Sequence, residues 1–186
     1  KAYQQPLFDY ISFWKHLYLF QLREMISENT KHSKTTIVIN EIMKLFNNGN
    51  TKFTHLDMNT NKHLINFSGA ENCFSELKFL YCYSCNGNDQ VLERLSRISK
   101  SVEILEFDAS ANNNSEIVKL IGAQRNLNNV RFLQSIDIIR DVSLYKTLEE
   151  SLIKRADTIQ HLRIRWIPMT KILSYLVNLK SVELRI

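Results

Sequence analysis

The apolar residues of this chain repeat a short template, in which the first, fourth and sixth positions are apolar. Phe53, Leu56 and Met58 form one copy, and further copies lie at residues 77–82, 102–107, 127–132, 159–164 and 179–184. The fourth and sixth positions are two residues apart, so their side chains point to the same side of a strand. Residues 53–58 and the five later copies therefore predict strands, with a possible first strand at 14–19.

The spacing of the copies is typical of a repeat protein. Their middle residues are separated by 24, 25, 25, 32 and 20 residues, and they are Leu56, Leu80, Leu105, Val130, Leu162 and Val182. Leucine-rich repeats have a period of about 20–29 residues, so every step except the longest fits.

Helical stripes of apolar residues lie between the predicted strands, at residues 38–46, 91–98, 117–121, 144–152 and 172–177. Strands that alternate with helices run parallel to each other, and stacked repeats bury their apolar sides as one elongated core. We therefore predict one α/β domain over residues 1–186, a leucine-rich-repeat-like solenoid with parallel strands on the concave side and helices on the convex side. Residues 7–25 also fit a single amphipathic helix, so the first strand has an alternative.

The residues between the apolar positions of each strand face away from the predicted core, on the surface where solenoids bind partners. Tyr and Arg are frequent at the centres of protein interfaces. We expect an aromatic group to anchor a protein partner and arginines to select an acidic segment of it. The candidate residues are His55, Asp57, Phe79, Tyr81, Tyr83, Glu106, Asp108, Arg131, Arg163 and Arg165. The alternative is that the aromatic residues pack against a flanking loop or another domain.

Composition adds limited information. The chain has 186 residues, of which 44% are apolar and 23% charged, and no apolar run is long enough to cross a membrane. Three cysteines indicate a reducing, intracellular compartment. The net charge of +5 permits a second function, binding of single-stranded nucleic acid by the concave face. The acidic residues Asp57, Glu106, Asp108 and Glu183 on that face count against it.

The sequence suggests no enzyme. Cys82 and Cys85 have CxxC spacing, but zinc needs four ligands and no second pair follows, so we predict no metal site. His16, His55 and His161 are expected on exposed strand faces, apart from one another. Glu149 and Glu150 are expected on a solvated helix face. We predict no catalytic residue and no cofactor.

Four segments resemble fungal F-box/leucine-rich-repeat proteins: residues 6–13, 69–77, 148–154 and 173–179. In that family an F-box module docks onto the adaptor of a cullin–RING ubiquitin ligase, and the repeats hold the protein to be ubiquitinated. The resemblance implies that residues 1–186 are the substrate-recognition region, in the cytoplasm or nucleus. Residues 7–25 are too short and too aromatic for an F-box. We expect a fragment of a longer chain that reaches the adaptor only through an F-box outside it.

Overall fold

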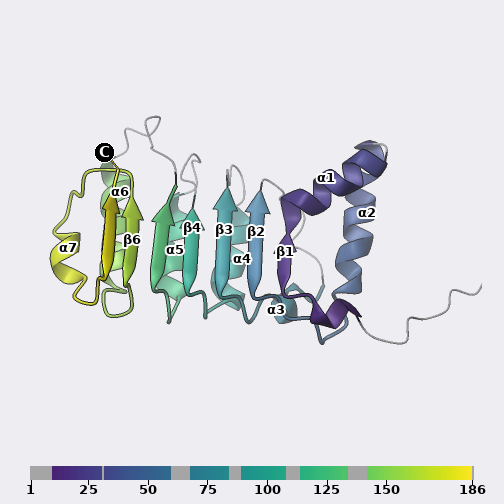
Figure 1. Cartoon of the computed structure of the whole chain (residues 1–186), viewed down its shortest axis with the longest axis horizontal. Coiled ribbons are helices and arrows are strands. Elements are labelled where there is room, and N and C mark those ends of the chain that lie inside the picture. Colours follow the sequence, from purple (N-terminus) through teal and green to yellow (C-terminus); the bar gives the residue numbers. More distant parts are fainter. Residues whose placement is uncertain are drawn as a thin grey trace, which may run out of the picture.

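A computed structural model describes residues 10–30, 32–59, 68–83, 89–107, 114–133 and 142–185. Its strands form one parallel sheet, in which spatial order follows chain order from β1 to β7 (Figure 1). The strands are β1 (His16–Tyr18), β2 (His55–Asn59), β3 (Phe79–Tyr83), β4 (Ile104–Phe107), β5 (Asn129–Phe132), β6 (His161–Ile164) and β7 (Ser181–Leu184). Each overlaps a segment that the apolar template predicts as a strand, so the prediction of parallel strands at these places is confirmed.

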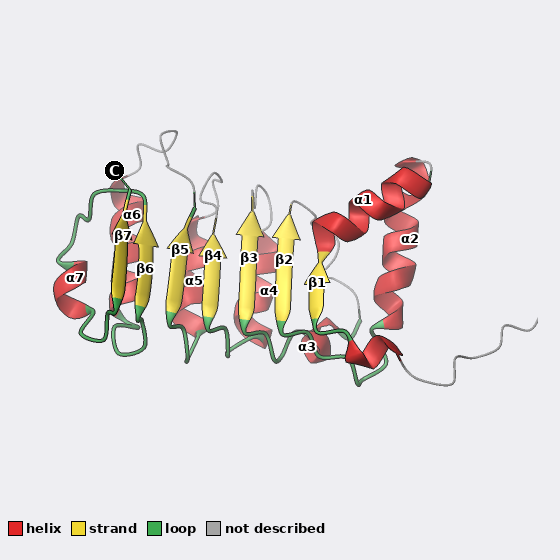
Figure 2. Cartoon of the chain, viewed as in Figure 1, coloured by secondary structure: helices red, strands yellow, loops and turns green. Residues whose placement is uncertain are grey.

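Helices separate the strands along the chain. They are η1 (Tyr10–Phe13), α1 (Leu19–Asn29), α2 (His32–Leu45), α3 (Ala70–Cys73), α4 (Asp89–Ile98), α5 (Asn114–Ala123), α6 (Val142–Ile153) and α7 (Ile172–Tyr175). Helices α4, α5 and α6 lie behind the sheet in Figure 2, and α1 and α2 lie beyond β1. The alternation of a parallel sheet with helices is the α/β arrangement that the sequence predicts.

Residues 7–25 include a strand followed by a helix, within their described part. β1 pairs with β2, with Leu17 opposite Leu56, and α1 begins at Leu19. The alternative of a single amphipathic helix is therefore wrong. Leu17 is buried between the exposed His16 and Tyr18, which is the alternation of a strand with one face on the core.

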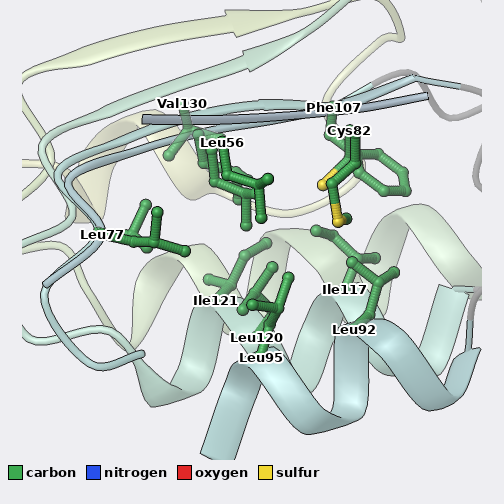
Figure 3. Packing of buried hydrophobic residues seen from close by; sticks show 14 of the residues in the cluster. Leu56, Leu77, Cys82, Leu92, Leu95, Phe107, Ile117, Leu120, Ile121 and Val130 are labelled. Atoms are coloured by element: carbon green, nitrogen blue, oxygen red, sulfur yellow. The ribbon is translucent and has the colours of Figure 1, made fainter. Parts of the chain in front are cut away.

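The core lies between the sheet and the helices behind it (Figure 3). The middle apolar residue of each strand is buried from β1 to β6 and stands opposite its counterpart on the next strand: Leu17, Leu56, Leu80, Leu105, Val130 and Leu162. From behind, Leu92 and Leu95 of α4 and Ile117, Leu120 and Ile121 of α5 pack toward them. Burying one such side chain contributes about 1.5–3 kcal/mol.

One backbone arrangement recurs where each strand begins. A single carbonyl at the start of one strand accepts hydrogen bonds from two successive N–H groups on the next. The accepting carbonyls are those of Lys15, Thr54, Lys78, Glu103, Asn128 and Gln160. The Lys78 oxygen, for example, accepts from Glu103 N at 2.8 Å and Ile104 N at 2.9 Å. This recurring contact aligns the strand starts, and it explains why equivalent residues of successive repeats stand opposite each other.

Two buried polar side chains connect neighbouring segments. Gln124, at the end of α5, donates to the carbonyls of Ser99 and Leu120 and accepts from Val102 N at 3.1 Å.

Glu149 of α6 is fully buried, so the prediction that it lies on a solvated helix face is wrong. Its carboxylate accepts hydrogen bonds from the segment after β6, at Trp166 Nε1 (2.9 Å), Met169 N (3.0 Å) and Thr170 N (2.7 Å). Its neighbour Glu150 is exposed, as expected.

Candidate protein-interaction face

We call the side of the sheet opposite α4, α5 and α6 the open face, because no helix among the described residues lies over it (Figure 2). The strand register arranges its side chains in two rows. The first row consists of His16, His55, Phe79, Ile104, Asn129, His161 and Ser181. The second row consists of Tyr18, Asp57, Tyr81, Glu106, Arg131, Arg163 and Glu183. The parallel pairing thus brings together residues separated by about one repeat in the sequence.

The part of the open face over β1, β2 and β3 is aromatic. The rings of His16 and His55 lie with their centroids 3.9 Å apart, and the ring of Phe79 stacks on His55 at 5.5 Å. Tyr18 meets His16 edge-on at 6.2 Å. The prediction that the histidines lie apart is wrong for His16 and His55, because β1 pairs with β2 and places them opposite each other.

Burial changes the proton affinities of two groups in this aromatic part. Desolvation, with a further contribution from the charge of His16, lowers the pKa of His55. Desolvation raises the pKa of Asp57. Both shifts favour the neutral form of the side chain, so this part of the open face is less polar than its residue types suggest. The Nδ1 atom of His55 is 2.9 Å from the hydroxyl of Thr54.

The part of the open face over β4 to β7 carries ion pairs. Arg131 Nη1 lies 2.6 Å from Glu106 Oε1, and Arg163 Nε lies 2.5 Å from Glu183 Oε2. Arg185 also bonds to Glu183. Hydrogen bonds from Arg185 and Arg163 lower the pKa of Glu183, so this carboxylate stays ionised. The open face therefore has two chemically different halves.

A pocket of about 290 Å³ lies in the charged half, over β5, β6 and β7. It is lined by Asn129, Arg131, His161, Leu162, Arg163, Ser181, Val182 and Glu183. The imidazole Nδ1 of His161 lies 2.8 Å from the Ser181 hydroxyl, and the side-chain oxygen of Asn129 is buried with no partner within the described residues.

The structure places most of the predicted binding residues on this one face. His55, Asp57, Phe79, Tyr81, Glu106, Arg131 and Arg163 all lie in its two rows. Arg165 follows β6 and does not line the pocket. Only the backbone of Tyr83 is described, and Asp108 lies outside the described residues, as does Cys85. The chain's other two cysteines, Cys73 and Cys82, are buried in the core.

The template places Asn129 and His161 on this face, and His16 is expected on an exposed strand face, but none of the three is among the candidate binding residues. Tyr18 was missed, and its position next to the buried Leu17 was the signal that could have found it. Among the described residues, no group of three or more His, Cys, Asp or Glu side chains could hold a metal ion, and no helix could span a membrane. No family model, curated protein or solved structure matches the chain.

Proposed function

We propose that this chain is a leucine-rich-repeat-type scaffold whose open face binds a protein partner. The observation that carries the proposal is the register of the sheet, which lines up aromatic residues over β1 to β3 and arginines over β5 and β6 on a face that no described helix covers. Aromatic and arginine side chains dominate the energetics of protein interfaces. The steps of 24 and 25 residues between middle residues of successive strands support the repeat class.

The resemblance of four segments to F-box/leucine-rich-repeat proteins suggests a more specific role. We propose that the partner is a substrate of a cullin–RING ubiquitin ligase, and that this chain is the part of the receptor that holds it. In F-box proteins a separate module binds the ligase adaptor. The role assigned to residues 1–186 is therefore substrate recognition alone, inside the cell.

Binding of nucleic acid by the same face has less support. A phosphate backbone is bound through a track of lysines and arginines that contacts several successive phosphates. Here Arg131 and Arg163 are each paired with a glutamate, and Asp57 shares their row. Successive phosphates along the face would therefore lie against Asp57, Glu106 and Glu183 as well as against the two arginines.

Affinity capture with matched variants tests the proposed function. The bait is the chain itself, and the open-face variant carries Phe79→Ala and Tyr81→Ala. The control variant carries Lys146→Ala and Glu150→Ala, two exposed residues of α6 on the helical side that leave the net charge unchanged. We expect a protein that the parent chain and the control both recover, and that the open-face variant recovers at least about tenfold less, as expected for interface residues of hot-spot quality. Equal recovery by all three contradicts the proposal.

The ligase role needs a separate measurement. If the captured protein is a ligase substrate, removal of this chain from cells lengthens its half-life in a synthesis-block chase, and proteasome inhibition does the same in cells that keep the chain. An unchanged half-life rejects the receptor role and leaves a binding scaffold.

A further inference from the structure

The pocket over β5, β6 and β7 has the size of a site for one small group. Its volume of about 290 Å³ lies just below the range of about 300–1,000 Å³ that drug-sized ligands occupy. A single side chain or a small ion fits such a space, and a helix or strand of a partner does not. The pocket therefore has room for one side chain or one small ion.

Two arginines of like charge stand directly opposite each other in this pocket, Arg131 on β5 and Arg163 on β6. Like charges opposite each other on adjacent strands are destabilising. Each arginine is held by a glutamate on the outer side of the pair, Arg131 by Glu106 on β4 and Arg163 by Glu183 on β7. The glutamates fix the positions of the two guanidinium groups, and both arginines line the pocket.

Most of the N–H donors of these two arginines have no partner among the described residues. Within the described part of the chain, Arg131 donates only from Nη1 and Arg163 only from Nε. A guanidinium group has five N–H donors in a planar fork, which matches two oxygens of a carboxylate or phosphate. The side chains of Arg131 and Arg163 are 43% and 30% exposed, so a ligand can reach them.

Glu183 also lines the pocket, but its charge is already compensated. One of its oxygens accepts from Arg163 and the other from Arg185. The charged side chains that line the pocket are Arg131, Arg163 and Glu183, which give it a charge of +2 − 1 = +1. The positive balance favours an anion over a cation.

We propose that Arg131 and Arg163 together bind one oxyanion group, the carboxylate or phosphate of a side chain of the partner. This proposal rests on the proposed function, because the oxyanion belongs to the protein partner. It identifies the kind of residue that the partner inserts over β5, β6 and β7. His161 and Asn129 form the adjoining polar wall of the pocket.

The test is a titration of the whole chain with two small probes, N-acetyl-aspartyl amide and N-acetyl-phosphoseryl amide, followed through the Nε–H signals of the arginines in NMR spectra. We expect saturable binding of at least one probe, with a dissociation constant on the order of millimolar, as one small polar ligand allows. The signals of Arg131 and Arg163 shift with it. Tighter binding of the phosphorylated probe indicates a modified partner, and equal or tighter binding of the aspartyl probe indicates an acidic one.

Variants separate a site from a diffuse charge effect. Arg131→Gln and Arg163→Gln are each expected to weaken binding by at least about tenfold, and Arg163→Lys also weakens it, because lysine lacks the planar fork. Arg185→Gln is the matched control, because it also removes a positive charge that is paired with Glu183, whereas Arg185 does not line the pocket. We expect this variant to change the affinity by less than about twofold, as for a charge that is screened by solvent. Thermal unfolding checks that each variant is folded.

Two results overturn the proposal: saturable binding of neither probe, or an equal loss with Arg185→Gln and Arg163→Gln. A failure of this kind is distinguishable from failure of the proposed function. If the probes do not bind but the Phe79→Ala, Tyr81→Ala variant still loses the captured protein, the open face binds its partner without an oxyanion in the pocket. If the probes bind but capture depends on neither half of the face, the pocket stands and the scaffold role fails.

Discussion

At the scale of single residues, the buried carboxylate of Glu149 holds the segment after β6 against α6. It accepts hydrogen bonds from an indole, two backbone N–H groups and a hydroxyl of Trp166, Met169 and Thr170. Glu149→Ala leaves at least three donors without their acceptor, and each unsatisfied group costs about 1–3 kcal/mol. We expect a loss of at least about 3 kcal/mol in the free energy of unfolding, measured by urea denaturation. The matched control is Glu150→Ala at the exposed neighbour, which changes stability by less than about 0.5 kcal/mol. Similar losses for both variants would reject the assigned role.

His55 makes the stability of the chain depend on pH. Its pKa is lowered in the folded state by burial and by His16, so between the folded pKa and the unfolded value of 6.5 the unfolded chain binds more protons. Stability therefore falls as pH decreases below about 6.5. His55→Gln is expected to flatten this slope, and His16→Gln to flatten it in part, because one of its two causes is removed. The measurement is the free energy of unfolding between pH 5 and 7.5, and an unchanged slope in His55→Gln contradicts the assignment.

Asp57 acts in a separate window near and above pH 3.8, where its raised pKa makes stability fall as pH increases.

At the scale of the elements, the strands differ in how completely their apolar sides are covered. Leu105 of β4 is fully buried, whereas Leu184 of β7 is 39% exposed. The same substitution at both places therefore compares an inner strand with the last one. Leu105→Ala is expected to cost about 2–5 kcal/mol, the usual range for a buried leucine. Leu184→Ala is expected to cost less than half as much. Denaturant midpoints of the two variants are the measurement, and equal losses would show that β7 is as well packed as β4.

The strands could be predicted from the sequence, and several side-chain partnerships could not. Phe53, Leu56 and Met58 and their counterparts reveal a strand because the spacing of apolar positions is local. The donors to Glu149 lie 17 to 21 residues away along the chain, and the pattern of charges gives no sign of them. The same holds for the contact of His16 with His55, which depends on β1 being a strand rather than part of a helix. Gln124 reads as an ordinary helix-end residue, yet it joins three backbone groups of the interior.

At the scale of the whole molecule, the two ends of the core are unlike. Beside β1, helices α1 and α2 bury Ile26, Met43 and Phe46. At β7, Val182 and Leu184 occupy the positions that are buried in the preceding strands, but they are 45% and 39% exposed. In a stacked array each unit is stabilised by its neighbours, so a strand with a neighbour on one side only opens more easily.

Amide hydrogen exchange compares the last strand, β7, with the inner strand β4, because the same backbone contact recurs at the start of both strands. Ser181 N donates to Gln160 O at 3.1 Å, and Ile104 N donates to Lys78 O at 2.9 Å at the equivalent place. We expect the Ser181 amide of the chain of residues 1–186 to exchange at least about tenfold faster than that of Ile104, since opening β7 exposes less buried apolar surface. Arg185 N, bonded to Ile164 O at 3.1 Å, should exchange rapidly as well. Equal protection at Ser181 and Ile104 would mean that β7 opens only with the whole sheet, and that the exposed Val182 and Leu184 do not weaken this end.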